Sequence, residues 1–386
     1  MRDTEAPVLT VEGGQYIQIE AGESFSANVS ATDNVDGDLT AKIEITGAVD
    51  TRTLGRYDLE YRVTDTSGNS TTFKQTVTVA DTVAPEIELN RRINSYVILG
   101  EQFHDLATAT DSFDGDLTDR IQVEGTVDTN TEGLYTLIYR VCDSSGNTAT
   151  LTSTINVQPK NTKGIPVLMY HWFYDDLAGE TQPTYLPVNQ MARSLFDSEI
   201  KYLAENNFYF PSFEELVAYS KGEIDLPRHS VILTDDDATA SFFRIAVPVL
   251  EKYGLTMTEF VITYKDTWQE YANNDCIDMQ SHSNYMHKVS SNSKGVMLSM
   301  SHDEIVADLQ TTQMLIEQLT GKTVNVFAYP FGHNNATARQ ALTDAGFICA
   351  FTTVDARVKV GQDPMIFPRV RMRSTDSLAR FKKLVD

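Results

Sequence analysis

Acidic and imidazole side chains follow apolar runs in the second half of this 386-residue chain. Four groups of polar or aromatic residues stand at the ends of such runs: Asp235–Asp237, His282 with His287, His171, and Tyr329–His333. A carboxylate together with two histidines is a common ligand set for Zn²⁺ or another divalent ion, and it leaves positions open for water and substrate. The sequence therefore predicts a metal site if the fold brings these run ends together.

The spacing of the histidine pair favours a loop. Residues i and i+5 of an α-helix differ by about 140° around the axis, so His282 and His287 would diverge on a helix. Ser283 and Asn284 lie between them and are typical of a loop, from which both rings can converge. Separate interpretations exist, because Asp235–Asp237 could simply cap a following helix and a single histidine is usually structural. Taken together at run ends, the residues favour the metal site.

Alternating strand and helix patterns must position these side chains. From Gly164 onward, short apolar runs typical of strands buried on both faces alternate with amphipathic stretches. The pattern predicts strands at 166–170, 231–233, 259–262, 324–328 and 349–352, and helices near 195–204, 241–253 and 302–319. Gly254 and Gly321 end two of these helices, and Ser301 with Glu304 forms a capping box at the start of the last. Such alternation predicts a parallel sheet or barrel with helices outside, in which working residues follow the carboxyl ends of strands.

The first half is a duplication with an offset of 78 residues. Ala6-Pro7 recurs as Ala84-Pro85, and residues 31–40 recur as 109–118 with the shared letters ATDxxDGDLT. A Tyr-Arg-Val segment at 61–63 also recurs at 139–141, followed in both copies by Ser-Gly-Asn. About seven short alternating segments per copy, with turn residues between them and no helical period, predict an antiparallel β-sandwich.

Each copy carries an acidic turn with three aspartates in the spacing DxxDGD, at Asp33, Asp36 and Asp38 and at Asp111, Asp114 and Asp116. Clustered carboxylates on a turn suit a hard cation such as Ca²⁺. The same side chains can instead cap local backbone N–H groups in a solvated turn. The sequence has no long ligand loop closed by a bidentate glutamate, which favours capping, and both interpretations stay open.

Composition and charge exclude several classes of protein. Apolar residues make up 41% and charged residues 22%, as in a soluble globular chain rather than a disordered or collagen-like one. The 54 acidic and 31 basic residues give a net charge of −23, which disfavours nucleic acid and anionic lipid as partners. No apolar run approaches the roughly 18–20 residues of a transmembrane span. The start MRDTEAPV is no leader, so we expect any signal peptide to have been removed or never to have existed.

The cysteines and a polar linker complete the outline. Cys142, Cys276 and Cys349 are widely spaced and form no CxxC motif. A Cys276–Cys349 bridge is conceivable, but two buried thiols are favoured. Residues 159–164 are short and polar and are predicted to be a linker. They separate two β-sandwiches, at 1–81 and 82–158, from a catalytic half at 165–386.

The repeated pattern APxI…ATDxxDGDLT…GxYxxxYRVxDxSGN, over about residues 5–158, resembles the bacterial immunoglobulin-like domains found in tandem on exported surface proteins. The resemblance implies an extracellular or cell-surface location. The two copies are then either passive spacers or modules that bind cell-wall glycan.

Four motifs over about residues 165–372 resemble the polysaccharide deacetylase family (NodB homology, carbohydrate esterase family 4). They are Pro166–His171 for PVLxYH, Thr234–Ala238 for TFDDG, His282-Ser283…His287 for H[ST]…H, and Phe327–Gly332 for FAYPYG. The wide histidine spacing is similar to that of the branch that deacetylates the poly-N-acetylglucosamine of biofilms. The resemblance implies a distorted (β/α) barrel, with Asp236 as the general base and Asp237, His282 and His287 as metal ligands.

Two departures from the family pattern lie beside the base. Asp235 replaces the usual Phe, and Ala238 replaces the usual Gly. A third carboxylate next to Asp236 predicts raised pKa values through like-charge repulsion, or an additional metal ligand. Arg369, in the segment 367–369, resembles the family's LPR element and is predicted to orient Asp236.

The general acid and the substrate contacts are less directly marked. The Leu-x-His motif that carries the acid in many relatives is missing near the C-terminus. His171 and His333 both follow predicted strands, and His171 is favoured because the biofilm branch keeps its acid in this N-terminal position. The residues predicted to contact the sugar are Tyr329, Pro330, Phe331 and His333.

The predicted function is metal-dependent hydrolysis of N-acetyl groups on an N-acetylglucosamine-containing polysaccharide of a biofilm or cell wall. Zn²⁺ is the first choice of metal, with Co²⁺ and Ni²⁺ as alternatives. Two other functions stay open, an O-acetyl esterase on xylan-type polysaccharide and a non-catalytic carbohydrate-binding surface protein.

Overall fold

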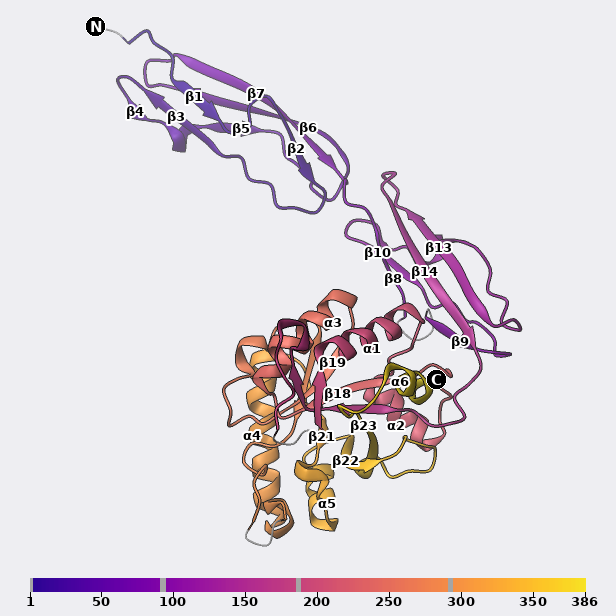
Figure 1. Ribbon diagram of the computed structural model, residues 1–386. Coiled ribbons are helices and arrows are strands. Elements are labelled where there is room, and N and C mark those ends of the chain that lie inside the picture. Colours follow the sequence, from indigo (N-terminus) through magenta and orange to yellow (C-terminus); the bar gives the residue numbers. More distant parts are fainter. Residues whose placement is uncertain (1–2, 91–94, 185–188, 291–293) are drawn as a thin grey trace. The chain divides into compact units, whose positions relative to one another are not determined.

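The computed structural model describes residues 3–90, 95–184, 189–290 and 294–386 (Figure 1). They fall into two compact units. The first comprises Met1–Ser95, Phe103–Val127 and Tyr135–Ile155, and the second comprises Tyr96–Gln102, Asp128–Leu134 and Asn156–Asp386. The second unit therefore contains residues 165–386 together with three short segments of the second repeat, 96–102, 128–134 and 156–158.

Within the described residues, each repeat contains seven strands in two sheets. In the first repeat the strands are β1 (Val8–Val11), β2 (Tyr16–Glu20), β3 (Val29–Asp33), β4 (Gly37–Asp38), β5 (Glu44–Thr46), β6 (Gly55–Thr64) and β7 (Ser70–Ala80). In the second they are β8 (Glu86–Glu88), β9 (Tyr96–Ile98), β10 (Thr108–Asp111), β11 (Gly115–Asp116), β12 (Gln122–Glu124), β13 (Gly133–Cys142) and β14 (Thr148–Gln158). The sheet orders are β1-β3-β4 with β2-β7-β6-β5, and β11-β10-β8 with β12-β13-β14-β9. The predicted all-β, immunoglobulin-like repeats are confirmed, except that one strand pair in each repeat, β2 with β7 and β9 with β14, is parallel rather than antiparallel.

The period-two pattern of the sequence explains how each repeat packs. In β6 the side chains of Leu59, Tyr61 and Val63 are buried, and the residues between them are more exposed. The hydroxyl of Tyr61 donates to Oε1 of Gln75 on β7 at 2.8 Å, so the one polar atom of this buried ring is paired. Strands β13 and β14 begin and end 78 residues after β6 and β7, and the duplication is thus kept in three dimensions.

Seven parallel strands close into a barrel in the catalytic half. They are β15 (Val167–Tyr170), β18 (Ile232–Asp236), β19 (Met257–Val261), β20 (Ile277–Ser281), β21 (Val326–Ala328), β22 (Cys349–Asp355) and β23 (Phe367–Arg371). The ring closes because β15 pairs in parallel with both β18 and β23. A short parallel pair, β16 (Trp172–Tyr174) and β17 (Gln190–Ala192), lies outside the barrel sheet. The predicted (β/α) barrel is confirmed.

Helices connect and cover these strands (Figure 1). They are α1 (Arg193–Glu205), α2 (Phe213–Lys221), α3 (Val247–Tyr253), α4 (His302–Thr320), α5 (Ala336–Asp344) and α6 (Leu378–Val385). The predicted helix boundaries at Ser301, Gly254 and Gly321 are confirmed, with a capping box at Ser301 and left-handed conformations at both glycines. In the described part of the chain, no helix combines the length and the apolar character needed to cross a bilayer.

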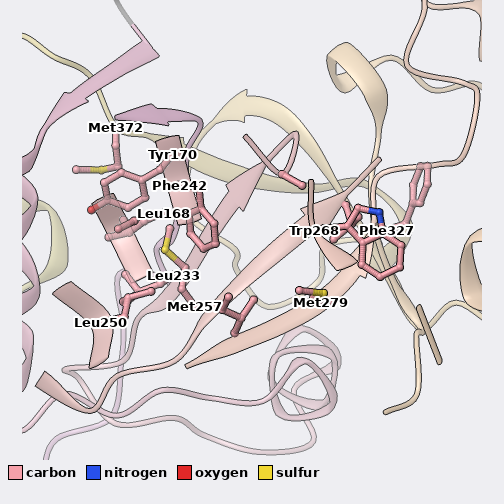
Figure 2. Close-up of a cluster of buried hydrophobic side chains, with 14 of the residues drawn as sticks. Leu168, Tyr170, Leu233, Phe242, Leu250, Met257, Trp268, Met279, Phe327 and Met372 are labelled. Atoms are coloured by element: carbon pink, nitrogen blue, oxygen red, sulfur yellow. The ribbon is translucent and has the colours of Figure 1, made fainter. Parts of the chain in front are cut away.

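Alternate residues of the barrel strands pack on opposite sides of the barrel wall. Leu168, Leu233 and Met257 pack with helix side chains, as Figure 2 shows around Phe242 and Leu250. The residues that alternate with them, among them Val167, Ile232 and Phe260, form a second cluster with neighbouring strands and α2. Two residues that are adjacent at a strand end therefore face opposite sides of the wall.

The cysteines lie in different surroundings. All three belong to the described chain and are free thiols, with Cys349 buried, Cys276 half-buried and Cys142 exposed. Cys276 packs against the cluster that Leu168, Leu233 and Met257 form with helix side chains, whereas Cys349 belongs to the second cluster. The Cys276–Cys349 bridge is thus absent, and burial raises the pKa of the Cys349 thiol well above its ordinary value.

Candidate active site

Asp237, His282 and His287 converge just beyond the carboxyl ends of β18 and β20. One ligand atom from each lies within 4.8 Å of the other two. Nε2 of His287 is 3.2 Å, and Nε2 of His282 is 3.7 Å, from Oδ1 of Asp237. His287 lies in a loop, as predicted, and the centroids of the two imidazole rings are 4.9 Å apart.

The donor atoms of this cluster fit a divalent metal. Nδ1 of His282 is 2.7 Å from the carbonyl oxygen of Ala328, so Nδ1 carries the proton and Nε2 presents its lone pair towards Asp237. Burial lowers the pKa of His282 to about 4 and keeps the ring neutral, as a metal ligand must be. Oδ1 of Asp237 is buried and has no hydrogen-bond partner among the described residues. A carboxylate oxygen facing two imidazole lone pairs is a donor set for Zn²⁺ or a similar ion.

Asp236 is held by Arg369 inside the barrel. Nη1 and Nη2 of Arg369 donate to the two carboxylate oxygens of Asp236, each at 2.7 Å, and both side chains are buried. The guanidinium also lies 5.5 Å from the ring centroid of Phe260 and 5.9 Å from that of Phe351. Burial alone would raise the pKa of Asp236, but the charge and hydrogen bonds of Arg369 outweigh it and hold that pKa well below its usual range. The predicted increase of this pKa by Asp235 is therefore wrong, and the predicted contact with Arg369 is confirmed.

Asp235 faces the opposite side of the barrel wall from Asp236. The ladder places it beside Glu259 of β19, and both side chains are fully buried. Burial, followed by the charge of Glu259, raises the pKa of Asp235 well above its ordinary value. The Asp/His cluster of the described residues contains Asp237 and not Asp235, so the prediction of Asp235 as an extra metal ligand is not supported.

His171 stands beside the carboxylate of Asp236. Nε2 of His171 is 3.9 Å from Oδ2 of Asp236, and the imidazole is 17% exposed. Burial lowers the pKa of His171, although the charges of Asp236 and Asp237 oppose that effect. His333 uses Nδ1 to accept the backbone N–H of Gly295 at 3.1 Å.

Comparison with known proteins gives this arrangement its family. Residues 223–350 match the family described as Polysaccharide deacetylase, and residues 9–79 and 87–157 each match the one described as Bacterial surface protein, Ig-like domain. The catalytic half is a polysaccharide deacetylase domain. It is a hydrolase of the carbohydrate esterase family 4 type, and the two Ig-like domains that precede it are of a bacterial surface kind.

Individual relatives are distant. The poly-beta-1,6-N-acetyl-D-glucosamine N-deacetylase of Staphylococcus aureus is 25% identical over 194 residues, which are 47% of this chain and 67% of that protein. The enzyme of the same name from Staphylococcus epidermidis is 25% identical over 190 residues, 45% of this chain and 65% of that protein. Among solved structures, IcaB from Ammonifex degensii has 24% identity and a TM-score of 0.48, covering 58% of this chain and 97% of that one.

The structure corrects two of the four predicted sugar contacts in the deacetylase domain. Tyr329 is fully buried with its ring packed against Phe327, and Pro330 is buried too, so neither offers a surface to a polymer. Phe331 is 37% exposed, and its ring centroid is 4.5 Å from that of His287. Phe331 and His333 therefore stay as predicted sugar contacts.

Two residues that hold the deacetylase site were not predicted. Oε1 of Glu259 accepts the backbone N–H of Ala238 at 2.7 Å, directly after Asp237. Asp308 of α4 accepts the N–H groups of residues 284 and 285 at 2.8 and 2.7 Å. It so supports the loop at 282–287, called the histidine loop below. An acid inside the apolar strand 257–261 was a usable signal for Glu259. Asp308 gives no such signal, because acids are common on exposed helix faces.

Proposed function

We propose that the deacetylase domain removes N-acetyl groups from an N-acetylglucosamine-containing polysaccharide of a biofilm or cell wall, with Zn²⁺ as the first choice of metal. One observation supports this most. At the end of β18, the Asp236–Arg369 ion pair lies directly beside the cluster of Asp237 with two histidines. Similarity to enzymes named poly-beta-1,6-N-acetyl-D-glucosamine N-deacetylase supports the class of sugar.

Asp236 is the proposed general base. Asp237, His282 and His287 would hold the metal, whose chemistry there is Lewis-acid polarisation of the acetyl carbonyl and of a water molecule. Arg369 keeps Asp236 ionised and fixes both of its oxygens, so the carboxylate is ready to take a proton from the attacking water. The water oxygen ends in acetate, and the C–N bond of the amide breaks.

His171 is the proposed general acid. The leaving nitrogen needs a proton, because an amide anion is a poor leaving group. Burial keeps His171 neutral before reaction, and its Nε2 lies 3.9 Å from Oδ2 of Asp236. The proton that Asp236 takes from water can therefore pass to His171 and from there to the amine.

Exposed aromatic rings beside the histidine loop support binding of a sugar polymer. The rings of Tyr264 and Tyr285 stack with centroids 5.2 Å apart and are 42% and 54% exposed. Nζ of Lys288 lies 4.3 Å from the Tyr285 ring centroid. Flat aromatic faces pack against the C–H faces of pyranose rings, so we add Tyr264 and Tyr285 to the predicted contacts.

Acetate release from β-1,6-linked N-acetylglucosamine oligomers tests the proposal. Metal-stripped protein should release no acetate, and reloading with Zn²⁺, Co²⁺ or Ni²⁺ should restore release. Asp237→Asn should lose both metal binding and turnover, whereas Asp236→Asn should bind metal without turnover. His302→Ala is the matched control, because His302 lies on the surface of α4 and pairs with Asp303 and Asp344.

The outcomes separate the competing functions. Substantial turnover by Asp236→Asn would contradict the assignment of the base. Release from acetyl-xylan but from no N-acetylglucosamine oligomer would make the domain an O-acetyl esterase. Binding of the oligomers without any release, with metal present, would favour a carbohydrate-binding role for the chain.

A further inference from the structure

Each Ig-like repeat contains its own cluster of carboxylates. Asp3, Asp33 and Asp65 offer oxygens within 4.8 Å of one another in the first repeat, and Asp81, Asp111 and Asp114 do so in the second. Asp81 and Asp111 stand 78 residues after Asp3 and Asp33, which is the offset of the duplication. The same pair of acids therefore meets twice, and one member of each pair lies outside the acidic turn.

In each acidic turn, capping of the backbone pairs only one oxygen of the first aspartate, Asp33 or Asp111. Oδ1 of Asp33 accepts the N–H groups of Val35 and Asp36, both at 2.9 Å. Oδ1 of Asp111 accepts those of the equivalent residues 113 and 114, at 2.8 and 2.9 Å. The other oxygen, Oδ2, is buried on both aspartates and has no hydrogen-bond partner in the described part of the chain. The capping interpretation is correct for Oδ1 and leaves Oδ2 unexplained.

Asp81 gives the stronger evidence for a missing ligand. It is only 6% exposed, and neither of its carboxylate oxygens has a hydrogen bond of normal length and angle to a described residue. The charged groups that act on it are the carboxylates of Asp111 and Asp143. Burial first, and then these two charges, raise the pKa of Asp81.

A cation resolves this arrangement. Buried charges in proteins are almost always paired or bound to a metal, since an unpaired buried charge is costly. Among the described residues, no Lys, Arg or His lies within ion-pair distance of Asp81 or Asp111. An all-carboxylate oxygen set is the choice of hard cations rather than of Zn²⁺ or Cu²⁺.

We propose that each Ig-like repeat binds one Ca²⁺ ion, at Asp3, Asp33 and Asp65 in the first repeat and at Asp81 and Asp111 in the second. Asp143, the equivalent of Asp65, and Asp114 complete the second site. Ca²⁺ accepts irregular sets of carboxylate and carbonyl oxygens, whereas Mg²⁺ demands near-octahedral geometry. The affinity expected for an extracellular module of this kind is about 10⁻⁴–10⁻³ M.

Binding at Asp81 would also act on the segment that joins the two repeats. Thr82, the next residue, donates from its backbone N–H and its hydroxyl to the carboxylate of Glu20, at 2.8 and 2.6 Å. A Ca²⁺ ion at Asp81 fixes the other side of this segment to the second repeat. We therefore expect Ca²⁺ to order residues 81–85.

Calorimetric titration of Ca²⁺ into the metal-stripped full chain tests the proposal. The wild type should bind one more equivalent than Asp81→Asn and one more than Asp33→Asn. Asp81→Asn loses no normal hydrogen bond and Asp33→Asn keeps an acceptor oxygen for its turn, so both variants should fold. Asp119→Asn removes an exposed acid of the second repeat outside the cluster and should bind as the wild type does.

Hydrogen exchange supplies the location. Ca²⁺ should slow amide exchange in peptides covering 81–85 and 109–118 in the wild type and not in Asp81→Asn. Absence of binding heat and of protection up to about 10 mM Ca²⁺, well above the affinity range of such modules, would overturn the proposal. Full stoichiometry retained in both variants would overturn the assigned residues, and equal binding of Mg²⁺ would overturn the choice of Ca²⁺.

Discussion

Replacing Glu199 by glutamine should make the stability of the deacetylase domain less dependent on pH. Glu199 lies on α1, is fully buried, and accepts the hydroxyl of Tyr170 on Oε2 at 2.8 Å. Its other oxygen has no partner among the described residues. Burial raises the pKa of this carboxyl from 4.5 to about 8, so the folded domain holds it as a neutral acid at neutral pH.

The sign and size of the effect follow from proton linkage. Between the unfolded pKa of 4.5 and the folded pKa of about 8, the folded state binds the proton and the unfolded state does not. The free energy of unfolding therefore falls as pH rises through this window. At about 1.4 kcal/mol per pKa unit, the whole window corresponds to roughly 5 kcal/mol, and the part from pH 6 to pH 8 to about 2 kcal/mol. Glutamine has no ionisable proton and escapes this loss.

Urea unfolding followed by tryptophan fluorescence measures the effect. Trp172 and Trp268 are the only tryptophans of the chain and both lie in the deacetylase domain, so the Ig-like repeats do not contribute to the signal. Relative to the wild type, Glu199→Gln should gain about 2 kcal/mol between pH 6 and pH 8. Burying the glutamine amide changes the free energy of unfolding by the same amount at both pH values. The readout is therefore how much the difference between variant and wild type changes from pH 6 to pH 8. Glu205→Gln, at an exposed position of the same helix, is the control, and an equal difference at both pH values for Glu199→Gln would refute the reasoning.

Further predictions concern the site. Arg369→Met leaves Asp236 buried without its guanidinium partner. The variant should lower the free energy of unfolding by about 3–5 kcal/mol in the same assay. A loss under about 1 kcal/mol would mean that the pair is solvated. Ala238 has φ +49°, so Ala238→Gly should raise stability by about 0.5–1 kcal/mol, and destabilisation would show that this backbone is not strained. Asp308→Ala removes the acceptor of two N–H groups in the histidine loop. It should weaken metal binding about 10- to 100-fold, measured in competition with a chelator. Unchanged affinity would show that the loop keeps its conformation without Asp308.

Features that depend on a few neighbouring residues could be predicted from the amino-acid sequence. The 78-residue offset, the alternating strands of the repeats and the capping box at Ser301 were all readable, because helix caps and strand periods depend on neighbours in the chain. The run Asp235–Asp237 and the histidine pair could be assigned to the ends of strands for the same reason. Strand limits shifted by a few residues, as β18 extends to Asp236 beyond the predicted 231–233.

Which of these side chains come into contact depends on the tertiary fold. Arg369 reaches Asp236 across 133 residues because β23 closes the barrel against β15, and no local pattern encodes that closure. The alternation of β18 sends Asp235 to Glu259 and Asp236 to Arg369, so two adjacent acids have opposite pKa shifts. Asp81 meets Asp111 for a similar reason. It lies just before the second repeat in the sequence, and only the fold brings it to the acidic turn of that repeat. Contacts of this range depend on strand register and barrel closure, which are set by packing of the whole domain rather than by any segment within it.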